Sequence, residues 1–153
     1  MKPRGILQLT IVGARCLPRM DRAQFGGKAS SDPFVKWYPQ NDPKEGKRTK
    51  AIRKEHMSPT WEESFELLIF DPSITTLCLE VYDEDFKFAG VIGGDDLIGR
   101  CEVETKELKP DVVEERTLPL ELDDGVEDEQ VAKLGEPTLT IKVKFAVYIF
   151  CLI

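Results

Sequence analysis

Apolar and polar residues alternate in short runs along most of the chain, and the runs are separated by prolines, glycines or acidic clusters. Alternation with a period of two is typical of a β-strand that buries one face. The clearest runs cover residues 6–12, 32–39, 47–54, 63–70, 76–82, 97–103 and 138–147. They predict an all-β protein, an antiparallel sandwich of seven or eight strands, with no internal repeat and no domain linker.

Helical periodicity is nearly absent from the chain. The one helical candidate covers residues 103–115, and Pro110 interrupts it, so only a turn or two of helix is expected there. Trp61 and Phe65 are predicted to be core residues, with no role in ligand binding. The acidic run at 121–130 predicts a solvated loop between strands.

The length and composition suit one soluble globular domain. The chain has 153 residues, of which 41% are apolar and 32% are charged, which is ordinary for such a domain. Its cysteines have neither zinc-site nor redox spacing, so they are predicted to be reduced, buried thiols of a cytosolic protein. They are Cys16, Cys78, Cys101 and Cys151.

The net charge of −7 argues against general nucleic-acid binding, which needs a basic face. Two predicted loops hold seven acids, and that number equals the excess of 28 acidic over 21 basic residues. These acids are Asp21, Asp32, Asp83, Glu84, Asp85, Asp95 and Asp96. No signal peptide is predicted at the start, and the last nine residues, FAVYIFCLI, are apolar but too short to span a bilayer.

The stretch VYDEDFKFAGVIGGDDLIG, at 81–99, combines five carboxylates with large apolar residues. The sequence offers only Lys87 and Arg100 as nearby cations to balance these acids. Calcium binds six to eight oxygen ligands, mostly carboxylates and carbonyls on loops. Two acidic loops at one end of a sandwich therefore predict a calcium site, and ordinary surface acids with turn-forming roles are the alternative.

Three segments carry a family resemblance: LPRMD…SSDPFVKW, HMSPTWEESFELLIFDP and LCLEVYDEDF…DDLIG. They resemble, in this order, the M-D…S-D-P-Y-V-K, N-P-x-W-N-E-x-F and V-x-D-x-D…D-x-I-G motifs of the C2 domain family. The resemblance covers about residues 5–147. It implies an eight-stranded antiparallel β-sandwich of type II permutation, most similar to C2 domains of plant synaptotagmins and extended synaptotagmins. The expected domain is the whole chain, 1–153, with an apolar tail at 148–153 of unassigned role.

The resemblance also implies which residues bind Ca²⁺. The five acidic ligands of the family fall on Asp21, Asp32, Asp83, Asp85 and Asp96, and carbonyls of Met20 and Glu84 are expected to contribute. The Asp21–Asp32 and Asp85–Asp96 intervals are longer than the family's common loops. The number of ions therefore stays open, and Asp95 is an alternative to Asp96.

Two further surfaces follow from the pattern. Apolar residues between the acidic ligands are expected at the loop tips, where they would insert into a membrane; these are Phe25, Phe88, Val91 and Ile92. Basic residues gather at 36–54, and in this family such a cluster can bind phosphoinositide headgroups. The cluster also includes Arg53 and Lys54, and the residues assigned to headgroup binding are Lys36, Lys47, Arg48 and Lys50. An ordinary solvated lysine face explains the cluster equally well.

Together these features predict a cytoplasmic, peripheral membrane protein that binds anionic phospholipid when calcium is present, at the plasma membrane or at a membrane contact site. Two alternatives stay open. One is a calcium-independent domain that binds a protein partner, and the other is a regulatory fragment of a larger lipid-transfer protein or enzyme. His56, the sole histidine, has no nucleophile near it in the sequence, so no enzymatic activity is expected.

Overall fold

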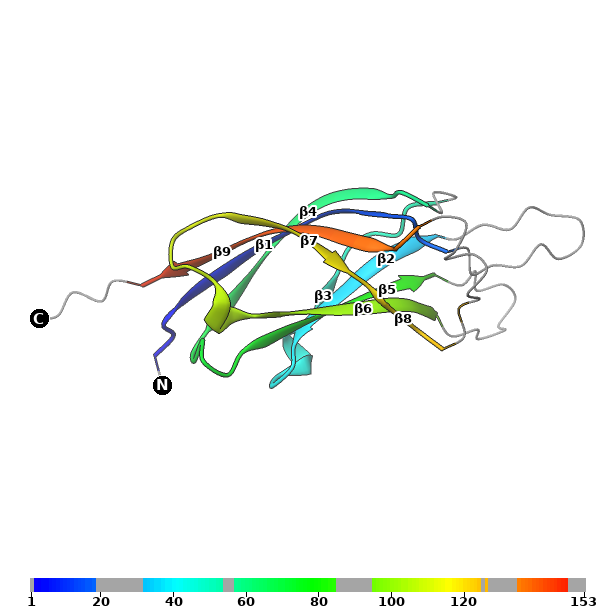
Figure 1. Cartoon of the computed structure of the whole chain (residues 1–153). Coiled ribbons are helices and arrows are strands. Elements are labelled where there is room, and N and C mark those ends of the chain that lie inside the picture. Colours follow the sequence, from blue (N-terminus) through cyan, green and yellow to red (C-terminus); the bar gives the residue numbers. More distant parts are fainter. Residues whose placement is uncertain are drawn as a thin grey trace, which may run out of the picture.

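The structure is a computed structural model that describes residues 2–18, 32–53, 57–84, 95–124, 126 and 135–148. Two antiparallel sheets pack face to face (Figure 1). The first has the strand order β4-β1-β9-β7, formed by Thr60–Ile69, Gly5–Arg15, Thr138–Val147 and Glu114–Pro119. The second has the order β3-β2-β5-β6-β8, formed by Lys47–Arg48, Pro33–Pro39, Thr76–Asp83, Asp96–Glu104 and Glu121–Leu122. The predicted antiparallel β-sandwich is confirmed.

The last strand, β9, lies inside its sheet between β1 and β7, as in the type II order that the sequence predicts. β9 pairs with β1 over their whole lengths, from Gly5 opposite Val147 to Arg15 opposite Thr138. The described residues form nine strands, one more than the family resemblance implies. Seven of them correspond to the alternating runs of the sequence, and β7 and the two-residue edge strand β8 lie outside those runs.

The core lies between the two sheets and is built from the inward positions of the alternating strands. Its fully buried side chains include Leu7, Leu9, Ile11, Trp37, Leu77, Leu79, Val81, Leu139 and Ile141. Each large aliphatic side chain buried in this way contributes roughly 1.5–3 kcal/mol. Trp61 is 7% exposed, and Phe65 packs edge-to-face on Trp37 with ring centroids 5.5 Å apart. The predicted core roles of Trp61 and Phe65 are confirmed.

The strand predicted at 47–54 is wrong in extent, because only Lys47 and Arg48 form β3. Beyond them the Thr49 side chain replaces the regular ladder. Its hydroxyl accepts a hydrogen bond from the Val35 amide at 2.9 Å, and the Ile52 amide donates to the Pro33 carbonyl at 3.1 Å. A short 3₁₀ turn, η1 at Pro43–Glu45, connects β2 to β3.

The helical candidate at 103–115 contains one short 3₁₀ turn, η2 at Thr105–Glu107. Its first residues end β6, and Glu114 begins β7, a strand that the sequence analysis did not identify. Pairing with β9 outweighs the local helical preference here: Glu114 lies opposite Val143, and the Asp111 amide donates to the Phe145 carbonyl at 2.8 Å. No helix among the described residues is long and apolar enough to cross a membrane.

The described cysteines are free thiols, as predicted, but only Cys78 is buried, and Cys16 and Cys101 are half-buried. Burial, with a smaller effect from Glu102, raises the pKa of the Cys101 thiol to about 12. Burial and the neighbouring Glu80 raise the pKa of the Tyr82 hydroxyl to about 12. Cys151 lies outside the described residues.

These raised pKa values predict that the fold weakens in alkali. Both groups keep their protons in the folded chain while the unfolded chain loses them near the ordinary pKa values of 9.0 and 10.0. The stabilisation is therefore complete below about pH 9 and is lost as the pH rises towards 12. Urea unfolding at pH 8, 9, 10 and 11 measures this decline, which should be shallower in Cys101→Ala. An equal slope in that variant would contradict the assignment.

Candidate metal centre

Three strands of the second sheet start or stop at one end of the sandwich, and each carries an aspartate there. β2 begins at Pro33, directly after Asp32; β5 ends at Asp83; and β6 begins at Asp96. Pro33 lies opposite Asp83, and Asp83 lies opposite Asp96 in the sheet register. The fold therefore brings three of the five predicted calcium ligands together at the end seen on the right of Figure 1.

Asp83 forms the buried base of this group. It occupies an inward position of β5 and has no solvent exposure. Its Oδ1 atom accepts a hydrogen bond from the Asp32 amide at 2.7 Å, and the Glu84 amide donates to the Asp32 carbonyl at 3.0 Å. A buried carboxylate is costly unless hydrogen bonds or charges compensate it. These bonds fix the backbone of the two strand ends around it.

Two local features position these strand ends. The Trp61 indole Nε1 donates to the Pro33 carbonyl at 3.2 Å, which ties β4 of the first sheet to the start of β2. A β-bulge between Val81 and Tyr82 of β5 leaves Ile98 as an extra residue on β6. Bulges of this kind redirect side chains at strand ends, and here the bulge sets Asp96 opposite Asp83.

The glycine of the D-x-I-G motif has a packing role. A Cβ atom on Gly99 would lie 2.9 Å from the Glu121 carbonyl oxygen and 3.3 Å from the Leu120 Cβ. Gly99 therefore allows β8 to pair closely with β6 just behind the aspartates. The glycine supports the site without contributing a ligand atom.

Two arginines pair with the acids of the site. The Arg53 Nη1 atom lies 3.5 Å from Asp32 Oδ2, and its Nη2 atom lies 3.3 Å from Glu84 Oε1. The Arg48 Nη2 atom lies 2.8 Å from Glu84 Oε2, and its guanidinium stacks 3.6 Å from the centre of the Phe34 ring. The sequence-based statement that only Lys87 and Arg100 could balance these acids is wrong, because Arg48 and Arg53 approach across the sheet from a segment distant in sequence.

The structure describes some of the other residues predicted for this site and not the rest. Glu84, Asp95 and Asp96 are placed next to the strand ends, and Asp95 and Asp96 are exposed. Seven predicted ligand or membrane residues lie outside the described residues: Met20, Asp21, Phe25, Asp85, Phe88, Val91 and Ile92. His56 lies outside them too.

The donor chemistry of the described residues fits calcium. Within the described ranges, no group of three or more acidic, histidine or cysteine side chains is already arranged to hold a metal ion. Two of the five predicted ligands lie outside those ranges. The three that are described offer hard carboxylate oxygens from three strand ends, the ligand type that calcium prefers. The Arg53 guanidinium on Asp32 is a cation already held at this end.

The predicted basic cluster is divided between two surfaces. Lys36 and Arg48 lie opposite each other on β2 and β3, on the outer face of the second sheet. Lys47 lies opposite the buried Trp37 and lines a separate groove, which Gln8, Ser64 and Glu66 also line. The Lys50 amide donates to Glu63 Oε2 at 2.8 Å. The structure therefore brings together only Lys36 and Arg48 of the four.

Acidic residues interrupt the positive charge on that outer face. Glu80 lies between Lys36 and Arg100 in the sheet register. The Tyr82 hydroxyl donates to Glu80 Oε1 at 3.1 Å, and the Tyr82 ring stacks on Phe34 with centroids 5.5 Å apart. Arg48 is also paired with Glu84. The face therefore carries both positive and negative charge. It also carries the stacked rings of Phe34 and Tyr82, which the sequence does not predict because strand pairing alone brings them together.

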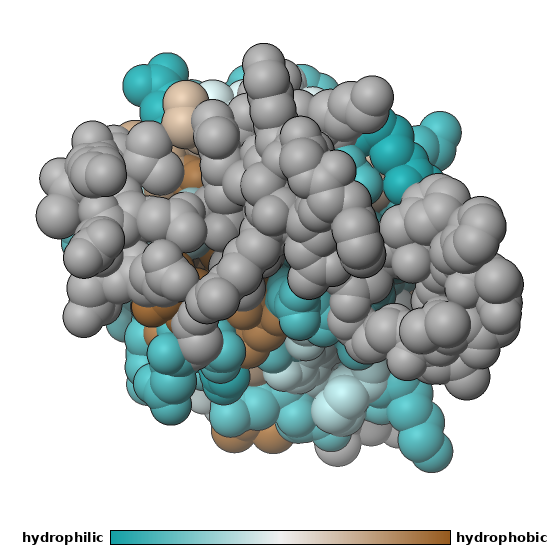
Figure 2. Space-filling view, turned by 90° about the vertical axis from the view of Figure 1, so that its right-hand side faces the viewer, coloured by the Kyte–Doolittle hydropathy of each residue, from teal (hydrophilic) through white to brown (hydrophobic). Residues whose placement is uncertain are grey.

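The described surface that can be seen at the aspartate end is mostly hydrophilic, and hydrophobic surface shows in several places, at the left, near the centre and at the lower edge (Figure 2). Trp61 and Gly99 support the strand ends that carry Asp32, Asp83 and Asp96.

The family model of the C2 domain matches residues 5–120 of this chain. The chain belongs to the C2 domain family. Relatives of this C2 domain include Synaptotagmin-2 of Arabidopsis thaliana, which is 31% identical over 145 residues, or 94% of this chain and 25% of that protein. A protein named Calcium-dependent lipid-binding protein, also of Arabidopsis thaliana, is 31% identical over 120 residues, or 78% of this chain and 21% of that protein.

A solved structure agrees with these relatives. A C2 domain of plant Extended Synaptotagmin 1 superposes on this C2 domain with a TM-score of 0.74 at 25% identity, covering 98% of this chain and all of that one. The predicted resemblance to plant synaptotagmin domains is thus confirmed. The chain spans about a fifth to a quarter of the length of the curated relatives described above.

Proposed function

We propose that this C2 domain binds Ca²⁺ and, with calcium bound, docks on anionic phospholipid membranes. The observation that carries the proposal is the placement of Asp32, Asp83 and Asp96 at adjoining strand ends. Membership in the C2 family, with a relative named for calcium-dependent lipid binding, supports membrane-lipid binding in general. No catalytic activity is part of the proposal. We propose that residues 1–153 act as one domain, because β9 completes the first sheet.

The proposed ligand set joins the three placed aspartates with two from the neighbouring chain segments. It consists of Asp21, Asp32, Asp83, Asp85 and Asp96, with backbone carbonyls of Met20 and Glu84 and with Asp95 as the alternative to Asp96. Asp83 is the fixed part of the set because it is buried and hydrogen-bonded. When bound, calcium would supply positive charge that offsets these carboxylates and attracts lipid phosphates.

Arg53 is proposed to limit calcium affinity, because its guanidinium already pairs with Asp32 and Glu84. Arg53→Gln should bind calcium roughly two- to fivefold more tightly, since a competing positive charge is removed from a partly exposed pair. Isothermal calorimetry without lipid measures the affinity. The matched control is Lys44→Gln, which removes the same charge from η1, at the opposite end of β2. An unchanged or weaker affinity in Arg53→Gln would contradict this role.

The apolar residues between the acidic ligands are proposed to enter the membrane. Phe25 belongs to the first loop, and Phe88, Val91 and Ile92 to the second. With the acids bare, an anionic membrane repels this end of the domain; offsetting their charge removes the repulsion. Each large side chain that then enters the interface contributes roughly 1.5–3 kcal/mol.

The insertion predicts a separation of two affinities. Phe88→Ala with Ile92→Ala should weaken vesicle binding at saturating calcium by at least tenfold, while calcium affinity without lipid stays unchanged. Val112→Ser with Val113→Ser, an exposed apolar pair elsewhere on the domain, serves as the control. Full vesicle affinity in the first variant would remove the insertion role and leave the calcium site intact.

Co-sedimentation with vesicles tests the proposed function. The domain is mixed with vesicles of phosphatidylcholine alone or with added phosphatidylserine, in calcium or in EDTA. Binding is expected only with phosphatidylserine and calcium together. Equal binding to both vesicles, or equal binding in EDTA, would contradict the proposal.

A phosphoinositide added to these vesicles tests the basic residues in the same assay. Lys36 and Arg48 share one face with Phe34 and Tyr82, whereas Lys47 lies in another groove. If the outer face recognises the headgroup, Lys36→Gln should reduce binding in EDTA and Lys47→Gln should not. If the domain binds neither phosphatidylserine nor the phosphoinositide, in calcium or in EDTA, a calcium-independent protein-interaction domain is favoured instead.

A further inference from the structure

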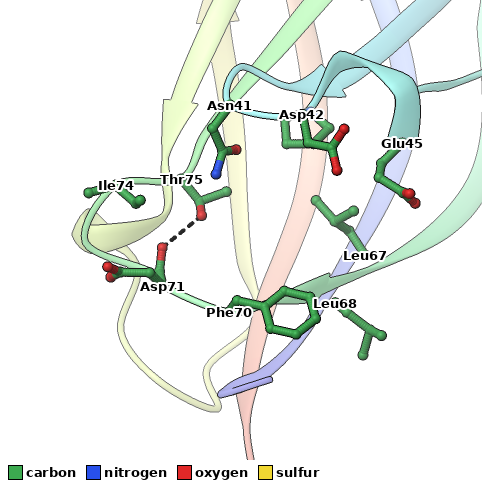
Figure 3. A pocket seen from close by; sticks show the side chains of 10 residues that line it. Asn41, Asp42, Glu45, Leu67, Leu68, Phe70, Asp71, Ile74 and Thr75 are labelled. Atoms are coloured by element: carbon green, nitrogen blue, oxygen red, sulfur yellow. Dashed lines mark hydrogen bonds between the residues drawn. The ribbon is translucent and has the colours of Figure 1, made fainter. Parts of the chain in front are cut away.

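An open groove lies at the end of the sandwich opposite the aspartates. Its cavity volume is about 520 Å³, and it runs between β4 of the first sheet and the η1 turn beside β2 of the second (Figure 3). Thr75, which lines it, directly precedes β5, while Asp83 ends that strand. Eight residues of β5 at about 3.3 Å each separate the groove from the aspartates by roughly 25 Å.

The floor of the groove is apolar and exposed. Leu68, Phe70 and Ile74 retain 49%, 43% and 62% of their accessible surface. β4 is the edge strand of its sheet, so the outward Leu68 has no neighbouring strand on its free side. Leu67 and Ile69 alternate with it and face the core, and Phe70 follows the strand. Large apolar side chains gathered in one exposed place mark an interaction surface more often than scattered ones do.

One wall of the groove is acidic. Asp42 directly precedes η1 and Glu45 ends it, and both lie across the groove from Leu67 and Phe70 (Figure 3). The Asp42 side chain makes no capping hydrogen bond to η1, and neither carboxylate forms an ion pair with any basic residue in the described ranges. Gly46 holds this wall in place: a Cβ atom there would lie 2.9 Å from the Tyr38 Cβ and 3.0 Å from the Trp37 carbonyl oxygen.

The end of the groove is stiffened by the turn at 71–75. Asp71 Oδ1 accepts hydrogen bonds from the Ser73 amide at 3.0 Å and from its hydroxyl at 2.6 Å, and Thr75 Oγ1 donates to the Asp71 carbonyl at 2.7 Å. The Ser73 hydrogen bonds lower the pKa of Asp71, and Arg4 contributes less. The turn therefore holds Ile74 at the mouth of the groove, and Asp71 adds a third negative charge. No lysine or arginine lines the groove.

We propose that this groove binds a peptide segment of a partner protein that carries large apolar side chains together with lysine or arginine. The apolar side chains would cover Leu68, Phe70 and Ile74, and the basic ones would pair with Asp42 and Glu45. Such a surface works independently of calcium, because none of its residues belongs to the aspartate end. It also remains accessible when the other end faces a membrane, so the domain can hold a membrane and a protein at once.

Other occupants fit the groove less well. An anionic membrane would be repelled by the acidic wall, and a flat bilayer cannot meet both ends of the sandwich together. A second copy of this chain has a net charge of −7, and like-charged copies repel each other. A basic, apolar segment satisfies both the floor and the wall.

Selection from a random peptide library tests the proposal. Displayed twelve-residue peptides are selected on the immobilised domain in EDTA without lipid, and the recovered peptides are synthesised and titrated. We expect peptides rich in Lys or Arg and in Leu, Phe or Trp. Their affinity should fall at least tenfold for Leu68→Ser with Ile74→Ser, and at least fivefold for Asp42→Lys with Glu45→Lys. Val112→Ser with Val113→Ser, exposed by 46% and 63%, should change it less than twofold.

Several results would overturn the proposal. These are recovery of no peptide that responds to the groove variants, recovery of peptides without basic residues, and affinity that survives Asp42→Lys with Glu45→Lys. The proposal would also be overturned if the unchanged domain sediments as a dimer and Leu68→Ser with Ile74→Ser sediments as a monomer. A loss of phosphatidylserine-vesicle binding in that variant would overturn it too. Circular dichroism confirms that each variant is folded, and the charge variant tests the groove even if the serine variant unfolds.

Discussion

Replacing Asp83 and Asp85 together with asparagine is expected to weaken calcium binding at least a hundredfold and to abolish calcium-dependent membrane binding. Two of five carboxylates lose their charge, and one of them, Asp83, is the buried base of the group. Calcium depends on such carboxylate oxygens for most of its affinity. Calorimetry with the isolated domain measures the loss directly.

The fold should survive this double change. An asparagine at position 83 retains an oxygen that can accept the Asp32 amide, as Asp83 Oδ1 does at 2.7 Å. In the absence of calcium, neighbouring carboxylates repel each other, so the stability of the calcium-free variant should be equal to or slightly above that of the unchanged chain. Undiminished calcium binding in the variant would disprove the proposed ligand set.

The matched control changes two acids with the same spacing at the other end of a neighbouring strand. Glu102→Gln with Glu104→Gln lies at the end of β6 that is remote from Asp96. It removes the same number of negative charges, two, from the chain. Calcium affinity should therefore stay within about twofold in the control, which separates loss of ligands from a general change in net charge.

Calcium is expected to raise the thermal midpoint of unfolding by a large amount. A ligand that binds only the folded chain stabilises it by mass action. With a dissociation constant of about 10⁻⁷ to 10⁻⁵ M, one millimolar calcium adds about 3–5 kcal/mol, which corresponds to a rise of roughly 6–20 °C for a domain of this size. Differential scanning calorimetry in calcium and in EDTA measures the shift.

Magnesium distinguishes a calcium site from a general response to divalent charge. It demands regular octahedral geometry and releases its water reluctantly, so the same concentration should shift the midpoint far less. An equal shift with magnesium would indicate nonspecific screening. No shift with calcium would contradict the site itself, and the Asp83→Asn, Asp85→Asn variant should respond to neither ion.

The sequence predicts the strands well where alternation is long and pairing is regular. The run at 138–147 corresponds to β9 without any change of boundary, and the runs at 6–12 and 76–82 each lie within a strand. Two errors come from contacts between segments that are separate in sequence. Thr49 replaces the ladder with a side-chain hydrogen bond and shortens β3, and β7 is formed by pairing with β9 over a segment that reads as a broken helix.

The candidate site is predictable in part, because ligand residues follow motifs while their partners do not. Asp32, Asp83 and Asp96 stand in recognisable motifs, and the register brings them together. The pairing of Arg53 with Asp32 joins segments on either side of β2, and no local pattern encodes it. The groove between β4 and η1 cannot be predicted from the sequence for the same reason. Leu68 has the pattern of an ordinary outward strand residue, and η1 faces it only in the folded chain.

The most direct test of the central claim measures calcium affinity with and without vesicles. If calcium and anionic lipid bind at one end of the domain and favour each other, linkage requires that each tightens the binding of the other by the same factor. Phosphatidylserine vesicles should lower the apparent calcium dissociation constant at least tenfold, and phosphatidylcholine vesicles should leave it unchanged. A calcium affinity that is the same with both kinds of vesicle as without lipid would contradict calcium-dependent docking.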